Sequence, residues 1–417
     1  MVALIFSRPD GQWFDFPPMQ MAAASGNHLT IPSKSELIEL PEGATLTMMP
    51  LAAPIGMDQE TGQFLALDEN PYKKRSEPVY AVAALLPQGF TRTYMPAATT
   101  AEQTLPLLGY TAVGSHKGKL YVAAAATDEH QRWAPRHYNS AGLPQLIAAR
   151  RREFPGNRII EQLAHCALEY GCFTAQNIFY RRWEGGIPVS PACNAACLCC
   201  ISEQPEGGAG SPQQRIGFCP EAQEIAAVAI AHLQQAEQPI ISFGQGCEGE
   251  PSLAYTQIAA AIRLIRGATE RGLININTNA GATEAVRELL EAGMDSFRVS
   301  LFSPIADEYM AYHQPRDYAF ADVLRSLRLM RERGRQVSLN LLTYPGFTDD
   351  RRRLDALCGL VQEMGIRQIQ LRNLNCDPSL MQDFCAASEP LGMLRFIYEL
   401  QKRLPEVRLG NYSRDLR

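Results

Sequence analysis

Short apolar runs and helical segments alternate along the C-terminal half of the chain. Six apolar runs rich in β-branched residues occur at 187–190, 239–244, 273–279, 296–302, 336–343 and 366–372. Segments with helical spacing separate them. Six strand–helix units in series predict a parallel sheet with right-handed crossovers. Curled, this sheet forms a partial (β/α)6 TIM-like barrel, in which active sites lie at the carboxyl ends of the strands.

Two of the helical segments have clear signals of their own. In 252–266, Ile258, Ile262 and Ile265 fall on one helical face. The segment 349–364 is expected to begin after Thr348 as N-cap, with acidic residues in its first turn.

Residues 1–140 follow a different pattern. Proline and glycine are frequent, and short apolar runs are separated by turn residues. The runs 108–113 and 120–123 flank a polar turn and predict a hairpin. We therefore expect a β-rich N-terminal domain at 1–140, a helical bridge at 141–184, the partial barrel at 185–405 and a C-terminal tail at 406–417.

Charge and composition exclude some functions. The formal net charge is −5, and the basic runs at 150–152 and 351–353 are expected to be solvated helix faces, so a nucleic-acid partner is not supported. No run of 18 apolar residues occurs, and the first residues lack a basic segment typical of a signal peptide. We expect a cytoplasmic protein with no membrane partner.

The strongest chemical signal is a group of four cysteines within eight positions. Cys193, Cys197 and Cys200 form a Cys-x3-Cys-x2-Cys triplet. Three thiolates on one loop can hold three irons of a cubane cluster and leave the fourth iron open. Zinc is the alternative, although a closed zinc site usually takes a second Cys-x2-Cys pair. Disulfide formation is disfavoured, because the chain is large and its 11 cysteines are odd in number.

With this triplet at a strand end, the region 185–400 resembles the radical S-adenosylmethionine (radical SAM) superfamily. The residue before the third ligand is usually aromatic in that family, whereas here it is Cys199. The spacing favours Cys200 as third ligand and leaves Cys199 as a buried or substrate-facing thiol. The resemblance implies two cofactors, a [4Fe-4S] cluster and S-adenosylmethionine.

The same resemblance implies the residues that bind S-adenosylmethionine. Gly249 and Glu250 match a Gly-Gly-Glu-Pro-like turn that takes the cofactor's ammonium, with Glu248 in place of the first glycine. Asn277 ends the third run and is expected near the ribose. Ser300 and Arg316 match the serine and arginine that hold the carboxylate in relatives, and an arginine suits a carboxylate because it can pair in bidentate fashion.

The implied activity is reductive cleavage of S-adenosylmethionine, which gives a 5′-deoxyadenosyl radical that abstracts hydrogen from an unknown substrate. An external electron donor such as flavodoxin or ferredoxin is implied as partner. The sequence does not identify the substrate, which could be a small molecule, a peptide or a protein. Cys199, Cys247 and Cys376 are candidate catalytic thiols. Two alternatives remain open, an activase of a glycyl-radical enzyme and a non-catalytic iron–sulfur or zinc-binding scaffold.

Overall fold

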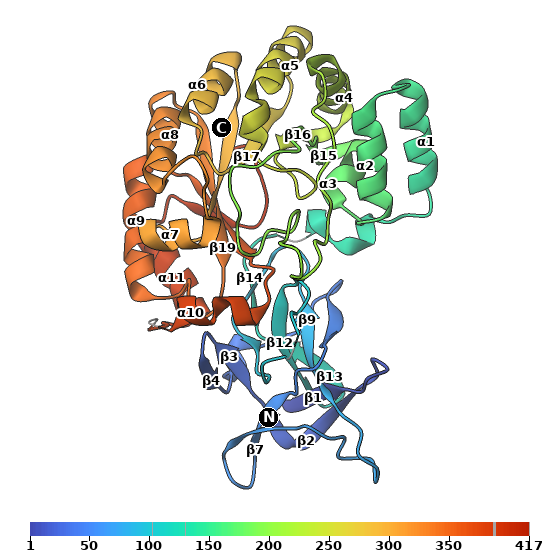
Figure 1. Ribbon diagram of the computed structural model, residues 1–417, viewed down its shortest axis with the longest axis vertical. Helices are drawn as coiled ribbons and strands as arrows, with labels where there is room; N and C mark the ends of the chain where they lie inside the picture. Colours follow the sequence, from blue (N-terminus) through green and yellow to red (C-terminus); the bar gives the residue numbers. More distant parts are fainter. Residues whose placement is uncertain (102, 130, 387–388, 417) are drawn as a thin grey trace.

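A computed structural model describes residues 1–101, 103–129, 131–386 and 389–416. A β-rich N-terminal domain lies beneath a curled parallel sheet with helices on its outer side (Figure 1). The strands of the N-terminal domain are β1 (Ala3–Ser7), β2 (Trp13–Met21), β3 (Ala23–Ser25), β4 (His28–Thr30), β5 (Ile38–Glu39), β6 (Thr45–Met49), β7 (Ile55–Asp58), β8 (Phe64–Ala66), β9 (Tyr80–Leu85), β10 (Phe90–Arg92), β11 (Met95–Pro96), β12 (Tyr110–His116), β13 (Lys119–Val122) and β14 (Ala124–Ala126).

Antiparallel pairing organises this domain. Its main sheet has the order β5-β13-β12-β9-β1-β2-β7-β8, with β6 also paired to β9. The predicted hairpin is confirmed as β12 and β13, joined where His116 pairs with Lys119. Lys117 and Gly118 both have positive φ angles, as a two-residue hairpin turn requires.

Three helices connect the N-terminal domain to the parallel sheet, namely α1 (Leu143–Glu153), α2 (Arg158–Leu168) and α3 (Phe173–Tyr180). Helix α2 begins at Asn157, whose side chain accepts hydrogen bonds from the N–H groups of Ile159 and Ile160. Residues 143–180 thus contain three helices between the N-terminal strands and the parallel sheet.

The parallel sheet has the sequential order β15 to β21 in the described chain. Its strands are β15 (Arg182–Gly186), β16 (Glu237–Phe243), β17 (Leu273–Thr278), β18 (Ser296–Leu301), β19 (Gln336–Thr343), β20 (Gln368–Asn373) and β21 (Arg408–Gly410). The helices that follow or flank them are α4 (Ala222–Gln235), α5 (Tyr255–Ala268), α6 (Thr283–Ala292), α7 (Ala306–His313), α8 (Phe320–Glu332), α9 (Arg351–Met364), α10 (Gln382–Cys385) and α11 (Met393–Arg403). The predicted partial barrel is thus confirmed.

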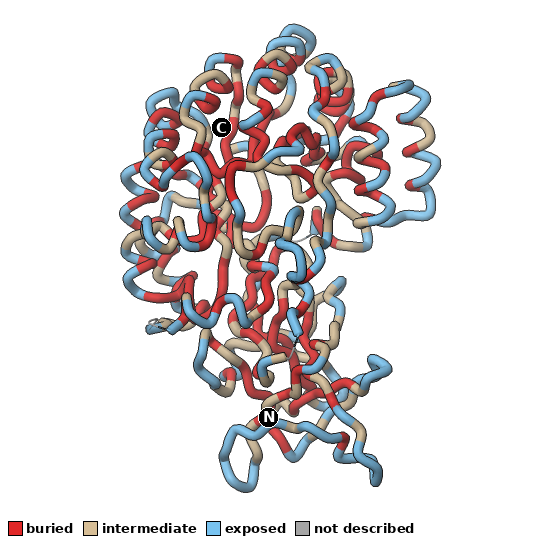
Figure 2. Tube along the Cα trace, viewed as in Figure 1, coloured by how far each residue is buried: buried red, intermediate tan, exposed pale blue. Residues whose placement is uncertain are grey.

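Apolar and polar residues alternate along these strands and divide the two faces of the sheet. Residues such as Ile241, Ile274 and Phe297 pack against the helices in the main hydrophobic core, and the strands show as largely buried in Figure 2. The residues between them face inward and bond one another across strands. The Ser242 hydroxyl, for example, donates to Glu184 Oε1 at 2.6 Å and accepts from Asn275 Nδ2. The barrel interior is therefore polar.

Three boundaries differ from the sequence prediction. The first strand is Arg182–Gly186, and residues 187–190 are not part of it. Strand β21 adds a seventh strand within the segment expected to be a tail. Helix α9 is capped by Asp350, which accepts from the N–H groups of the next turn, while the Thr348 hydroxyl accepts from Tyr344 N–H instead.

The N-terminal domain is joined to the barrel at the carboxyl ends of β19 and β20. Arg92 is fully buried there, and its guanidinium donates to the carbonyls of Leu374 (2.7 Å), Tyr110 (3.3 Å) and Thr343 (3.4 Å). Burial lowers the pKa of Arg92 to about 10, so the side chain stays protonated at neutral pH. One side chain therefore ties both parts of the molecule together.

No helix among the described residues is long and apolar enough to cross a membrane.

We expect Arg92→Leu to destabilise the protein, because the carbonyl oxygens of Leu374, Tyr110 and Thr343 each lose a donor at the seam. Each unsatisfied buried polar group costs about 1–3 kcal/mol, so a total loss of about 2–4 kcal/mol is expected. Urea unfolding followed by tryptophan fluorescence measures it. Arg287→Leu is the control, because Arg287 is 42% exposed on α6 and should change stability by less than about 0.5 kcal/mol. Equal losses in the two variants would contradict the role of Arg92.

Candidate iron–sulfur and cofactor site

The three cysteines of the triplet lie on an irregular loop, here called the cysteine loop (residues 187–202), which follows the carboxyl end of β15. Cys193, Cys197 and Cys200 are free thiols in the part of the chain that the structure describes, and all three are partly exposed. A loop without regular structure leaves its backbone N–H and C=O groups to be satisfied from elsewhere. Two neighbouring segments supply most of these partners.

The first segment is the turn after β16, here called the glycine turn (residues 244–251). Gly249 N–H donates to Ser190 O and Glu250 N–H donates to Ala192 O, both at 2.8 Å. Gly249 is required by this close approach, because a Cβ atom at that position would overlap the Ala192 carbonyl. The glycine turn therefore holds the main chain of the cysteine loop directly.

Glu248 reinforces this contact with its side chain. One carboxylate oxygen accepts from the N–H groups of Val189 (2.7 Å) and Ser190 (3.1 Å). The other accepts from those of Gly244 (2.6 Å) and Gln245 (2.8 Å). Burial raises the pKa of Glu248 to about 7, and the four N–H donors oppose that rise. The carboxylate joins the start of the cysteine loop to the start of the glycine turn.

The second segment is the end of α7 with the residues that follow it. Ala196 N–H donates to His313 O at 3.1 Å, and Leu198 N–H donates to Tyr312 O at the same distance. Farther along, Arg316 N–H donates to Asn194 O at 2.9 Å. The cysteine loop is therefore clamped between the glycine turn and the end of α7.

The three thiols are close enough to influence one another. Burial raises the pKa values of Cys193 and Cys197, and the neighbouring Cys193 and Cys200 raise that of Cys197 further. Thiols of this kind become thiolates when a metal binds, because a coordinating thiol is deprotonated. A positive charge also lies beside the triplet, because Arg215 Nη2 is 3.8 Å from Cys200 Sγ.

The donor set fits an iron–sulfur cluster. Among the described residues, no three His, Cys, Asp or Glu side chains converge on a single ion position. Ligands of a cubane need not converge, because each thiolate binds its own iron, whereas the four ligands of a structural zinc site surround one ion. Three sulfurs on one clamped loop suit the cluster.

Cys199 corrects a prediction, because disulfide formation was disfavoured and Cys199 was expected to be a free thiol. Cys199 instead forms a disulfide with Cys376, 177 residues later and just beyond β20. Both residues are buried in one hydrophobic cluster, and a sulfur in a disulfide is not a thiolate ligand. The pairing therefore favours Cys200 as the third member of the triplet. Of the other candidate thiols, Cys247 is buried against Cys166.

Glu250 lies beside the cysteine loop and Asn277 lies against the glycine turn; both were expected to bind the cofactor, and both already make hydrogen bonds within the protein. Glu250 accepts from Ser252 N–H (3.0 Å), from the Thr278 hydroxyl (2.5 Å) and from Asn279 N–H (2.8 Å). Asn277 Nδ2 donates to Gly244 O at 2.9 Å. Glu250 is 5% exposed and Asn277 is 9% exposed, so little of either side chain reaches solvent.

Ser300 and Arg316 are placed less closely. Ser300 lies on β18, partly exposed and in register with Asn340 of β19. The Arg316 main chain contacts the cysteine loop, but its side chain is exposed to solvent. The structure thus places Gly249 and Glu250 against the cysteine loop and Asn277 against the glycine turn, and it leaves the side chain of Arg316 exposed.

Two residues that pack against the cysteine loop were not predicted. Glu248 was noted only as a replacement for glycine, although an acid between glycines directly after a buried strand is a detectable signal. His313 received no role, yet its Nδ1 lies 3.2 Å from Cys197 Sγ. A single histidine in a helix gives no such signal, because its neighbour is 116 residues away in sequence.

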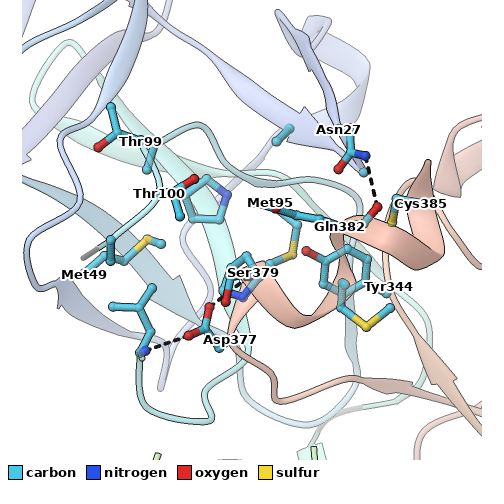
Figure 3. A pocket seen from close by; sticks show the side chains of 18 of the residues that line it. Asn27, Met49, Met95, Thr99, Thr100, Tyr344, Asp377, Ser379, Gln382 and Cys385 are labelled. Atoms are coloured by element: carbon cyan, nitrogen blue, oxygen red, sulfur yellow. Dashed lines mark hydrogen bonds between the residues drawn. The ribbon is translucent and has the colours of Figure 1, made fainter. Parts of the chain in front are cut away.

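A pocket of about 350 Å³ opens at the seam between the N-terminal domain and the barrel (Figure 3). Met49, Met95, Tyr344 and Asp377 line it, as Figure 3 shows, and Met381 is a further lining residue. Asp377 is occupied structurally, since its carboxylate accepts from the N–H groups of Leu105 and Ser379. Several of these lining residues belong to the same hydrophobic cluster as Cys199 and Cys376.

The sequence and the structure of the chain were compared with those of known protein families and proteins. The model of the radical SAM superfamily matches residues 187–357, which include the cysteine loop, the glycine turn and strands β16 to β19. No curated protein matches the chain.

Several solved structures are similar at low identity. One is a radical SAM methyltransferase from Sphaerobacter thermophilus, at 18% identity and a TM-score of 0.40, covering 56% of this chain and 67% of that one. Another is SuiB from Streptococcus suis bound to its precursor peptide SuiA, at 12% identity and a TM-score of 0.39, covering 61% of this chain and 53% of that one. A third is anSMEcpe with bound AdoMet, at 15% identity and a TM-score of 0.40, covering 54% of this chain and 64% of that one.

The chain thus spans between about half and two thirds of the length of anSMEcpe and SuiB. Residues 187–357 thus match a radical SAM domain, and members of that superfamily use a [4Fe-4S] cluster and S-adenosylmethionine.

Proposed function

We propose that this protein is a radical SAM enzyme in which Cys193, Cys197 and Cys200 hold a [4Fe-4S] cluster. The observation that supports the proposal most directly is the clamped cysteine loop, whose three thiols are free while Cys199 is withdrawn into a disulfide. When bound, such a cluster supplies one-electron reductive cleavage of S-adenosylmethionine to methionine and a 5′-deoxyadenosyl radical. Three protein ligands leave one iron for the cofactor.

The protein's own residues bind and orient the cofactor in this proposal. Glu250 can accept a hydrogen bond from the cofactor's ammonium, because its Oε2 accepts one described bond and an ionised carboxylate oxygen has two lone pairs. Gly249 lets the turn approach the loop. Asn277 is proposed to lie near the ribose, and Ser300 and Arg316 near the carboxylate. Arg316 must turn inward from its exposed position to do so.

The proposal also implies an electron donor, a cellular location and a role for the N-terminal domain. The cluster is oxygen-sensitive and needs a reductant, which we propose to be an external flavodoxin or ferredoxin in the cytoplasm. The N-terminal domain is proposed to shape access for the substrate, because it meets the barrel at the carboxyl ends of β19 and β20. The substrate itself is unassigned.

Cleavage of S-adenosylmethionine tests the enzyme proposal. We expect the anaerobically reconstituted, dithionite-reduced protein to form 5′-deoxyadenosine slowly without substrate, as measured by chromatography. Cys197→Ala should form none, because it cannot assemble the cluster. An intact, reduced cluster without 5′-deoxyadenosine would argue for the non-catalytic scaffold.

Cluster content tests the ligand assignment. Replacing Cys193, Cys197 or Cys200 by Ala should abolish the four-iron cluster, while Cys199→Ala should keep it. Iron and sulfide counting with visible absorption gives the readout. Retention in Cys200→Ala together with loss in Cys199→Ala would reverse the assignment of the third ligand.

Cofactor affinity tests Arg316. Losing a charge-assisted hydrogen bond costs about 1.5–3 kcal/mol, so Arg316→Ala should bind S-adenosylmethionine roughly 10- to 150-fold more weakly while keeping its cluster. Arg316→Lys should recover little, because lysine lacks the planar fork. Arg325→Ala, 61% exposed on α8, is the control. Calorimetric affinity unchanged in Arg316→Ala would exclude this residue from the carboxylate site.

A further inference from the structure

His313 contacts one particular thiol of the triplet. It is the last residue of α7, is 2% exposed, and its Nδ1 lies 3.2 Å from Cys197 Sγ. The main-chain carbonyl of the same residue accepts from Ala196 N–H. His313 therefore holds the cysteine loop by its backbone and meets the neighbouring thiol with its ring.

Chemistry decides the direction of this hydrogen bond once Cys197 is a ligand. A thiolate sulfur can only accept, so Nδ1 must carry the proton. Nε2 has no hydrogen-bond partner among the described residues. In the neutral imidazole, a proton on Nδ1 leaves Nε2 as an acceptor. In the charged imidazolium both nitrogens carry protons, and Nδ1 is still a donor.

The ring is not free to turn away. Its centroid lies 4.3 Å from that of Tyr309 and 5.0 Å from that of Tyr312, the latter edge-on. Both tyrosines are buried. Packing on two sides therefore holds the ring in its position beside the sulfur.

We propose that His313 is a positioning residue that donates its Nδ1–H to the cluster-ligating sulfur of Cys197 and thereby raises the reduction potential of the cluster. The inference rests on the proposed function. Hydrogen bonds to cluster sulfurs are among the factors that set the potential, because they stabilise the additional negative charge of the reduced form. One electron enters from an external reductant, and His313 keeps its proton.

Two substitutions separate the hydrogen bond from packing. His313→Leu removes the donor and keeps an apolar side chain. His313→Asn places an amide N–H near the position of Nδ1. His232→Leu is the matched control, because His232 is another buried imidazole, and its Nε2 bonds to Trp183 O, away from the cysteine loop.

The measurement is an anaerobic redox titration of the reconstituted proteins with dithionite, followed by electron paramagnetic resonance. We expect His313→Leu to retain four irons and to titrate at a more negative potential, where a tenfold weaker preference for the reduced form corresponds to 59 mV. His313→Asn and His232→Leu should titrate close to wild type. His313→Leu at the wild-type potential would overturn the proposal, as would His313→Asn shifted equally far.

Cluster release to an iron chelator gives a second readout if His313→Leu assembles poorly. Loss of partners that orient ligands typically costs 10- to 100-fold in metal affinity, so faster release is expected from His313→Leu and not from His313→Asn. Equal release from both variants would assign His313 to packing alone. A wild-type protein that assembles no cluster would instead contradict the proposed function.

Discussion

The structure of the candidate site depends on the carboxylate of Glu248. An irregular loop exposes backbone donors that regular structure would satisfy, and each one left unpaired in the interior costs free energy. Glu248 accepts four of them, two from the cysteine loop and two from the glycine turn. An ionised carboxylate can accept two such bonds on each oxygen. One side chain therefore fixes two functional segments relative to each other.

This arrangement couples the thiols to the residues expected to bind the cofactor. The glycine turn that carries Glu248 also carries Gly249 and Glu250, whose N–H groups bond the cysteine loop. On the opposite side, the end of α7 supplies carbonyl acceptors from Tyr312 and His313. A displacement of either segment would move the three thiols. The positions of the three thiols are thus set by the clamp as much as by the cysteines themselves.

The sequence predicted the partial barrel and the triplet because both leave local signals, namely apolar runs that alternate with helical segments and the spacing of the cysteines. It missed the first strand because Arg182–Gly186 contains few apolar residues. Glu184 in that strand faces the polar interior, where it accepts from Ser242, whereas Ile187 and Val189 are buried outside any strand. The Cys199–Cys376 disulfide and the contact of His313 with Cys197 join residues more than 100 positions apart. Such pairs are set by tertiary structure and leave no local pattern.

The role of the N-terminal domain follows from the open form of the barrel. A closed barrel surrounds its strand ends with its own loops, but this sheet stops after β21. The carbonyl of Leu374 beyond β20 obtains its donor from Arg92, and Leu105 N–H from the N-terminal domain bonds Asp377. The disulfide adds a covalent link between this same segment and the cysteine loop. The β-rich domain therefore covers the edge of the barrel that carries Cys376. Because Cys376 is bonded to Cys199, this edge is covalently linked to the cysteine loop.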